Sequence, residues 1–222
     1  VWPDYVAAST AEELAQRWIN ECENGFEGTD VRPGVLAEFG SNEDGVPEDA
    51  DKVFQAACMT QQAVGIPIST HCGLRDCDWQ VEAFKRHGAQ IDKVVLGHMM
   101  PSDASAVAAG LSNPEMEHLK RILDTGVNVG IDTVGYGERD NGKLFEHGKA
   151  QLAKTFADWG HIEQVTVSCD MTRKYHLKKY GGHGFALLMD WFAPLLREVG
   201  LSDEQVDQIM VENPKRILTP TN

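Results

Sequence analysis

Four short apolar segments of the sequence each end in a residue that can bind a metal ion. Each segment has the length and composition of a buried β-strand, as in residues 165–170. The residues at their ends are Glu38, His71, His98 and Asp170. This set of carboxylate oxygens and imidazole nitrogens suits Zn²⁺, and also Mn²⁺ or Co²⁺. The pattern therefore indicates a metal site assembled from several strands.

The same residue types can support hydrolysis. A carboxylate can bridge two divalent cations that lie about 3.5–4 Å apart, and a water between them loses its proton near neutral pH. The resulting hydroxide is a nucleophile, and an aspartate beside it can accept its proton. We therefore expect two divalent metal ions as cofactors and a small molecule as the substrate.

Helices are expected between these strands. Thr10 and Glu13 form a capping-box pattern, Pro47 suits the first position of a helix, and Gly65 ends that helix. A second capping-box pattern begins at Ser202. The expected helices cover approximately residues 10–24, 47–65, 78–87, 114–126, 142–159, 185–199, 202 onward and a short segment from 213. A further strand is expected at 127–132, and residues 1–2 resemble the end of another.

Alternating strands and helices predict a parallel sheet of right-handed βαβ units. A doubly wound sheet and a (β/α)8 barrel both satisfy this order. The positions of the ligand residues favour the barrel, because active sites of such barrels lie at the C-terminal ends of the strands. No Gly-x-Gly-x-x-Gly motif supports a dinucleotide site. The expected fold class is thus α/β, a TIM barrel of the metal-dependent hydrolase type.

The number of strands is too small for a complete barrel. Five complete strands are expected, so we predict that roughly the first two to three strands of the barrel are missing from the sequence. Residues 1–222 are then a single partial-barrel domain. Unpaired strand edges invite association, so a homodimer is one expected assembly.

Several motifs together resemble the phosphotriesterase-like family of the amidohydrolase superfamily. The resemblance covers essentially the whole chain in order, and it is carried by these motifs: 34–40, Ser69-Thr70-His71, Gly97-His98, Ser168-Cys169-Asp170, the glycine-rich loop 181–185 and Asn213-Pro214-Lys215-Arg216. It is greatest for the branch called phosphotriesterase homology proteins. That branch has a bridging glutamate in a Glu-Ile-Gly motif, which corresponds here to Glu38-Phe39-Gly40. Other members use a carboxylated lysine.

The resemblance implies a role for each ligand residue. Glu38 would bridge two metals, His71 and His98 would bind the more exposed metal, and Asp170 would bind the buried metal and shuttle the proton. The family's first strand supplies a His-x-His pair to the buried metal. No such pair occurs in this sequence.

The function implied by the resemblance is metal-dependent hydrolysis of an ester-type bond through a metal-bridging hydroxide. The family hydrolyses lactones, phosphoesters, phosphotriesters and some amides. The candidate substrate-binding residues lie on loops beyond the strands: Arg75, Tyr136, Arg173 and His183. The alternative is a non-catalytic partial barrel that binds at most one metal and acts as an interaction module.

Other residues of the same chemical types have simpler interpretations. Asp132 also ends an apolar strand, and we interpret it as a helix cap or turn residue at least as readily as a substrate contact. The cysteines near the site could bind metal or act as nucleophiles, but we interpret them as partly buried filling residues: Cys72, Cys77 and Cys169. We expect the remaining histidines to be solvated: His87, His118, His147, His161 and His176.

The composition narrows the classes of partner. A formal net charge of -14 and a pI near 4.9 argue against binding to nucleic acid or to an anionic membrane surface. No apolar run approaches the roughly 18 residues that a membrane span needs. Five cysteines with irregular spacing favour a reduced, intracellular protein, and we expect a cytoplasmic location.

Overall fold

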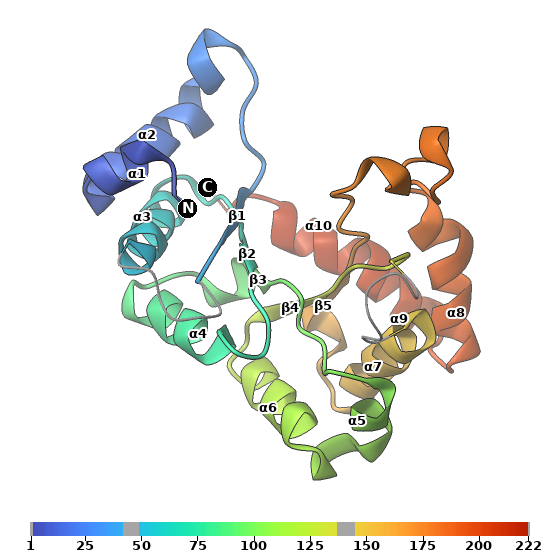
Figure 1. Cartoon of the computed structure of the whole chain (residues 1–222). Helices are drawn as coiled ribbons and strands as arrows, with labels where there is room; N and C mark the ends of the chain where they lie inside the picture. Colours follow the sequence, from blue (N-terminus) through green and yellow to red (C-terminus); the bar gives the residue numbers. More distant parts are fainter. Residues whose placement is uncertain (1, 42–48, 137–144, 222) are drawn as a thin grey trace.

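A five-stranded parallel sheet forms the centre of the computed structural model, which describes residues 2–41, 49–136 and 145–221. Its strands follow one another in chain order, and each pairs in parallel with the next. They are β1 (Leu36–Gly40), β2 (Ile68–His71), β3 (Val94–Leu96), β4 (Asn128–Ile131) and β5 (Val165–Val167). The sheet curves through the middle of the molecule (Figure 1). The predicted number of complete strands, five, is confirmed for the described residues.

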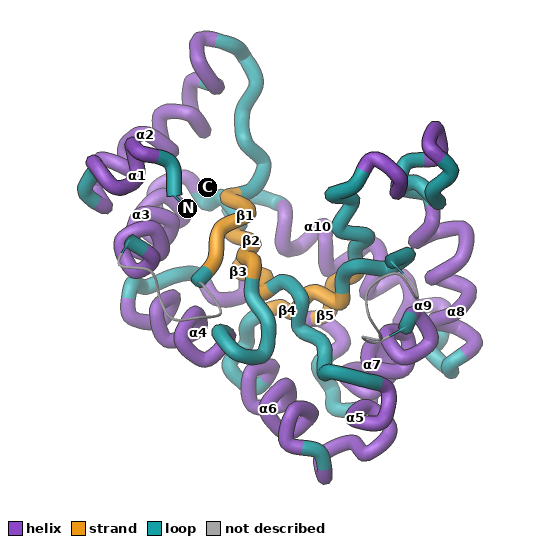
Figure 2. Tube along the Cα trace, viewed as in Figure 1, coloured by secondary structure: helices purple, strands orange, loops and turns teal. Residues whose placement is uncertain are grey.

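Helices connect successive strands and lie outside the curved sheet (Figures 1 and 2). The connecting helices are α3 (Ala50–Val64), α4 (Cys77–Arg86), α5 (Ala104–Ala109), α6 (Pro114–Leu123) and α7 (Glu146–Asp158). The left-handed conformation of Gly65 ends α3, as predicted. Because every crossover is helical and every strand pair is parallel, the expected α/β class is confirmed.

Two helices precede the first strand and pack on α3. They are α1 (Asp4–Ala8) and α2 (Ala11–Asn24). Val6 and Leu14 are buried against Val53 of α3. The predicted capping box at the start of α2 is present: Glu13 donates its N–H to Thr10, whose own N–H binds the Glu13 carboxylate. The expected strand at residues 1–2 is wrong for Trp2, which precedes α1 without joining a strand.

The C-terminal third is helical. After the short turns η6 (Lys174–His176) and η7 (Lys178–Tyr180) come α8 (Ala193–Glu198), α9 (Asp203–Asp207) and α10 (Asn213–Leu218). Wider π-helical turns, η8 (Leu188–Phe192) and η9 (Gln208–Glu212), lead into α8 and α10. The capping box at Ser202 and Gln205 is present. None of the helices in the described residues has the length and apolar character needed to cross a membrane.

Aromatic side chains fill the space between β1 and the helices beside it. Phe54 of α3 is fully buried, and its ring centroid lies 5.1 Å from Phe39, 5.0 Å from Trp79 and 4.9 Å from Phe84. Phe39 directly follows Glu38 in β1. Packing around Phe54 therefore holds the strand that presents the first candidate ligand.

Helix α10 closes the opposite end of the sheet through polar contacts. The buried Asn213 amide donates to the carbonyl oxygens of Ile162 and Val165, both at 2.7 Å. Arg216 donates to the side-chain oxygen of Asn128 at 2.7 Å. These contacts lie at the N-terminal ends of β4 and β5. The Asn-Pro-Lys-Arg motif therefore anchors the sheet and lies away from the strand ends that carry the ligand residues.

Several predicted boundaries differ from those observed. Strand β3 ends two residues before His98, and β5 ends three residues before Asp170. Helix α5 was not expected. Pro47 and Gly142, the expected starts of two helices, lie outside the described residues; the observed helices begin at Ala50 and Glu146. Apart from α5, the core of each of these elements was predicted and its end was displaced.

Candidate functional site

Three of the four candidate ligands meet at the C-terminal ends of β1, β2 and β3. His98 Nε2 lies 3.6 Å from Glu38 Oε1, and the ring of His98 lies 4.6 Å from the ring of His71. The Glu38 side chain is 48% exposed and that of His98 is 22% exposed. The register of the parallel strands brings the three residues together. Phe39 of β1 pairs with Thr70 of β2, and Ser69 of β2 pairs with Val95 of β3, so the three strands end at the same edge of the sheet.

Asp132, at the end of β4, holds His98 by two contacts. Its Oδ1 lies 2.7 Å from His98 Nδ1, and its Oδ2 accepts the backbone N–H of His98 at 2.6 Å. With Nδ1 occupied, His98 directs Nε2 toward Glu38. The interpretation of Asp132 as a cap or turn residue is therefore wrong. The signal that could have identified it was already visible, since Asp132 ends an apolar strand just as the four candidates do.

The same contact sets the protonation of His98. Its hydrogen bond with Asp132 raises the pKa of His98 above the ordinary value, while burial acts in the opposite direction. The negative charges of Asp132, Glu38 and Asp170 raise the pKa further. Asp170 is thus close enough to act electrostatically on His98. Without a metal ion, these contacts therefore favour the protonated imidazole more than water does.

The backbone is unusual where the chain leaves β3, β4 and β5. His98, Thr133 and Asp170 have φ angles of 58°, 57° and 43°, a region that residues other than glycine seldom adopt. Such conformations are concentrated at functional sites, where the surrounding structure enforces them. At Gly97 a Cβ atom would lie 2.7 Å from the carbonyl oxygen of Thr70, so only glycine allows this approach beside His98. The Gly97-His98 motif therefore has a steric basis.

Asp170 is held by the tyrosine that follows β4. The Tyr136 hydroxyl lies 2.9 Å from Asp170 Oδ2 and 2.8 Å from the Thr172 hydroxyl, and it also contacts the backbone carbonyl of Asp170. Tyr136 was predicted as a substrate contact. The structure places its hydroxyl against Asp170, and its side chain lines the neighbouring cavity.

A cavity of about 330 Å³ lies next to Asp170. It is lined by Tyr136, Cys169, Met171, Tyr175, His176 and His183, together with loop glycines and the apolar Val134 and Leu187. His176 is only 8% exposed, and its Nε2 has no hydrogen-bond partner among the described residues. The expectation that His176 is solvated is therefore wrong. A buried ring nitrogen without a partner is available to a molecule in the cavity.

The glycine-rich loop fixes the position of His176. Gly182 packs so tightly that a Cβ atom there would lie 2.2 Å from the carbonyl oxygens of Tyr175 and His176. Gly184 donates its N–H to the His176 carbonyl at 2.9 Å. The His176 ring lies between two tyrosines, with centroids 4.5 Å from those of Tyr136 and Tyr175. No sequence pattern indicated this burial, because it depends on two segments that are distant in the sequence, the loop after β4 and the loop after β5.

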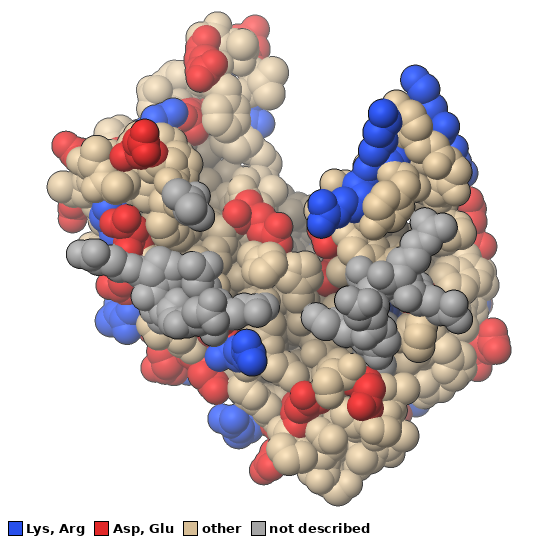
Figure 3. Space-filling model, in the orientation of Figure 1, with Lys and Arg blue, Asp and Glu red and all other residues tan. Residues whose placement is uncertain are grey.

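Of the remaining candidate substrate residues, only some line the cavity. His183 is exposed and lines it, whereas Arg75 and Arg173 are exposed and are not part of the lining. The space-filling view shows a hollow with acidic side chains on its floor, and with Lys and Arg side chains on the side formed by η6 and η7 (Figure 3). The segment that contains these two turns includes Arg173, Lys174, Lys178 and Lys179. We call the exposed Lys and Arg side chains of segment 173–179 the basic rim; Arg173 belongs to it and does not line the cavity.

The fold agrees with comparisons to known proteins. A sequence model of the Phosphotriesterase family matches residues 1–218. The chain is 31% identical over 216 residues to the phosphotriesterase homology protein of Escherichia coli (strain K12), covering 97% of this chain and 69% of that protein. It is 31% identical over 214 residues to N-acetyltaurine hydrolase of Danio rerio, covering 95% of this chain and 59% of that protein. The chain belongs to the phosphotriesterase family.

Solved structures support the same assignment. The phosphotriesterase homology protein from Escherichia coli, described as complexed with phosphate in its active site, superimposes with a TM-score of 0.83 at 30% identity, covering 98% of this chain and 70% of that one. A resiniferatoxin-binding protein from Rhodobacter sphaeroides gives a TM-score of 0.85 at 26% identity, covering 98% and 59%. The fold is thus that of the family's TIM barrels, with five of the strands in a partial barrel.

One pair of donor atoms at the strand ends has the separation that a divalent cation requires. Two ligand atoms of a tetrahedral zinc ion lie about 3.4 Å apart, given metal–ligand distances near 2.0–2.1 Å. His98 Nε2 and Glu38 Oε1, at 3.6 Å, are close to that separation. The ligand atoms of Glu38, His71, His98 and Asp170 do not form a group of three or more within 4.8 Å of one another. The fit therefore holds for the pair Glu38 and His98, with His71 beside it.

Proposed function

We propose that the chain is the metal-binding part of a hydrolase that cleaves ester-type bonds in small molecules: lactones, phosphoesters or phosphotriesters. The observation that carries the proposal is the meeting of Glu38, His71 and His98 at the strand ends, with Asp132 behind His98. Membership of the phosphotriesterase family and the position of the cavity beside Asp170 support it.

In this proposal Glu38, His71, His98 and Asp170 would hold two divalent cations, most simply zinc, with manganese or cobalt as substitutes. The cations, when bound, supply Lewis acidity that lowers the pKa of water and polarises the scissile group. The chain's own residues orient the ligands and transfer the proton. Asp132 keeps the proton of His98 on Nδ1, so that Nε2 remains a donor for the metal.

Asp170 is the proposed proton acceptor. Its carboxylate takes the proton of the attacking water and returns it to the leaving group. The Tyr136 hydroxyl, 2.9 Å from Oδ2, fixes the orientation of that carboxylate. His176 and His183 line the cavity in which the substrate's remaining groups would lie. The Lys and Arg side chains on the η6–η7 side would attract an anionic substrate toward the hollow.

A second candidate reaction is hydrolysis of an N-acyl amide. It is favoured by the relatives named N-acetyltaurine hydrolase, among them those of Danio rerio and Xenopus tropicalis. N-acetyltaurine carries a sulfonate, which matches the basic rim at Arg173 and its neighbours. The attack on an amide carbonyl would use the same cations and the same proton acceptor.

The test uses the longest natural chain that contains this sequence, loaded with Zn²⁺, Mn²⁺ or Co²⁺ and assayed with lactones, phosphate esters, aryl esters and N-acetyltaurine. Turnover of one class, with kcat nearly abolished in Asp170→Asn, supports the proposal. Tyr136→Phe should lower kcat less and alter its pH dependence. Unchanged kcat in Asp170→Asn would overturn the mechanism.

Metal analysis separates the hydrolase from the alternative, a non-catalytic partial barrel. The alternative is motivated by the absence of a His-x-His motif from the sequence. Two metal ions at the strand ends, lost together in Glu38→Gln, are expected for the hydrolase. At most one ion, together with no turnover of any substrate class, would favour the interaction module.

A further inference from the structure

A second group of metal-binding side chains lies outside the strand-end site, between helices α4 and α6. Within the parts of the chain that the structure describes, one set of three His, Cys, Asp or Glu residues has all its ligand atoms within 4.8 Å of one another. It consists of Cys77 and Asp78, in the first turn of α4, and His118 on α6. None of these residues takes part in the proposed hydrolysis.

We propose that Cys77, Asp78 and His118 form a binding site for a thiophilic divalent cation, Zn²⁺ in particular, that links α4 to α6. The three side chains supply a thiolate sulfur, a carboxylate oxygen and an imidazole nitrogen. Zinc accepts this combination in a tetrahedral arrangement, with the fourth position open to water. The strand-end site offers only oxygen and nitrogen, so the two sites differ in chemistry.

The distances between the donor atoms agree with a tetrahedral cation. Cys77 Sγ lies 3.4 Å from His118 Nε2. A zinc ion with a Zn–S distance near 2.3 Å and a Zn–N distance near 2.05 Å separates such atoms by about 3.6 Å. His118 Nε2 and Asp78 Oδ2 lie 2.8 Å apart, and a bound zinc ion would require about 3.4 Å. Asp78 therefore has to withdraw by roughly half an ångström, and its side chain is 58% exposed and free to do so.

The contacts do not match a cysteine nucleophile activated by histidine. In that arrangement the thiol and the carboxylate contact opposite nitrogens of the imidazole. Here both Cys77 Sγ and Asp78 Oδ2 contact the same atom, Nε2 of His118. The three donor atoms thus lie within 4.8 Å of one another, close enough for one cation to contact all of them.

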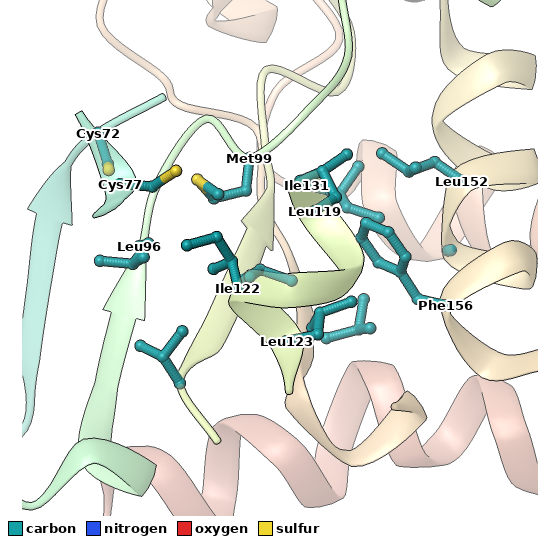
Figure 4. Packing of buried hydrophobic residues seen from close by; sticks show 14 of the residues in the cluster. Cys72, Cys77, Leu96, Met99, Leu119, Ile122, Leu123, Ile131, Leu152 and Phe156 are labelled. Carbon is teal, nitrogen blue, oxygen red and sulfur yellow. The ribbon is translucent and has the colours of Figure 1, made fainter. Parts of the chain in front are cut away.

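The surroundings suit a site that is buried on one side and open on the other. Cys77 is fully buried, the His118 side chain is 20% exposed, and Asp78 faces solvent, so a cation can enter past the carboxylate. Figure 4 shows the sulfur of Met99 directed toward that of Cys77, and both side chains are fully buried. Arg121, whose Nη1 is 3.9 Å from Asp78 Oδ1, is the competing cation, and it is 61% exposed.

Binding of a cation would convert the Cys77 thiol to a thiolate. Burial raises the pKa of Cys77 to about 12, and the thiol contacts the Leu74 carbonyl at 3.4 Å. A coordinating cation displaces the thiol proton outright. The S–H bond breaks, a sulfur–metal bond forms, and the proton leaves to solvent. The first turn of α4 also favours negative charge on Cys77 and Asp78.

The test is titration of the purified full chain with Co²⁺, whose thiolate complexes give a charge-transfer absorption that oxygen and nitrogen ligands do not. We expect this absorption in the wild type, its loss in Cys77→Ser, and at least a tenfold loss of Co²⁺ affinity in Asp78→Asn and His118→Asn. Asp78 is 58% exposed, so we expect Asp78→Asn to keep the fold. Zn²⁺ should displace Co²⁺ and raise the melting temperature of the wild type more than that of Asp78→Asn.

Matched cysteine variants identify the thiolate. Cys72 and Cys169 adjoin the strand-end candidates His71 and Asp170, and Cys22 lies on α2. The absorption should persist in Cys72→Ser, Cys169→Ser and Cys22→Ser. The proposal is overturned if the wild type shows no thiolate absorption, if the absorption survives in Cys77→Ser, or if Asp78→Asn and His118→Asn leave the Co²⁺ affinity unchanged. The proposed hydrolysis is tested by kcat in Asp170→Asn, and the cation site between α4 and α6 is tested by the Co²⁺ absorption. The two proposals can therefore fail independently.

Discussion

The carboxylate of Asp132 binds His98 through both the ring and the backbone, with Oδ1 2.7 Å from Nδ1 and Oδ2 2.6 Å from the backbone nitrogen. Asp132 is only 6% exposed, so these contacts are shielded from water. A carboxylate that accepts the Nδ1–H of a histidine fixes the tautomer that can bind metal through Nε2. The first two predictions follow from this pair.

Asp132→Asn should weaken metal binding at the strand ends by about 10–100-fold, the range usual for loss of such a partner. Its amide can still contact the ring but cannot enforce the Nδ1–H tautomer. Calorimetric titration of the purified chain with Zn²⁺ measures the effect. The matched control is Asp158→Asn, an exposed carboxylate that pairs with Lys154, which should bind Zn²⁺ as the wild type does. Equal affinity in the two variants would contradict the orienting role of Asp132.

The metal-free chain should lose stability as the pH rises, because the pKa of His98 is raised in the folded state, chiefly by its hydrogen bond with Asp132. A raised pKa contributes stability that is fully present below the unfolded value of about 6.5 and is lost as the pH passes the folded value. Urea denaturation in a chelator, from about pH 6 to 9, measures this contribution as the difference between wild type and Asp132→Asn. A pH-independent difference would contradict the assignment.

The alternation of strands and helices was predictable because it depends on local signals. Capping pairs such as Thr10 with Glu13, and stop signals such as Gly65, act within a few residues. The strand cores were also predictable, since apolar β-branched runs of this length have few alternatives. The ends of β3 and β5 were not, because His98 and Asp170 adopt positive φ angles that only the surrounding structure can impose.

The candidate site was predictable as a set of residues but not as a set of contacts. Glu38, His71 and His98 could be placed at strand ends, yet the role of Asp132 required the register between β3 and β4. His98 and Asp132 are 34 residues apart in the sequence. His118 was likewise expected to be solvated, and its contact with Cys77 depends on how α6 packs beside α4. Periodicity along the chain carries no information about such pairs.

His176 offers a prediction about substrate affinity, based on its unpartnered Nε2 in the cavity. His176→Asn keeps an acceptor for the Arg173 N–H, which lies 3.4 Å from Nδ1, but removes the group at Nε2. For any substrate that the loaded enzyme turns over, kcat/KM should fall about 2–10-fold, the net value of one hydrogen bond. His176→Gln places its amide near the Nε2 position and should recover part of the loss. Identical values for Asn and Gln would indicate that the ring only fills space.

Asn213 should be a major determinant of stability without being part of the site. Its fully buried amide donates to the carbonyls of Ile162 and Val165 and accepts a hydrogen bond from Gln208 at 2.7 Å. Asn213→Ala leaves these groups unsatisfied in a dry environment, so the free energy of unfolding should fall by about 2–4 kcal/mol. Asn24→Ala, an exposed amide at the end of α2, is the control and should change it by less than about 0.5 kcal/mol. Urea denaturation measures both, and equal effects would show that the contacts of α10 do not anchor the sheet.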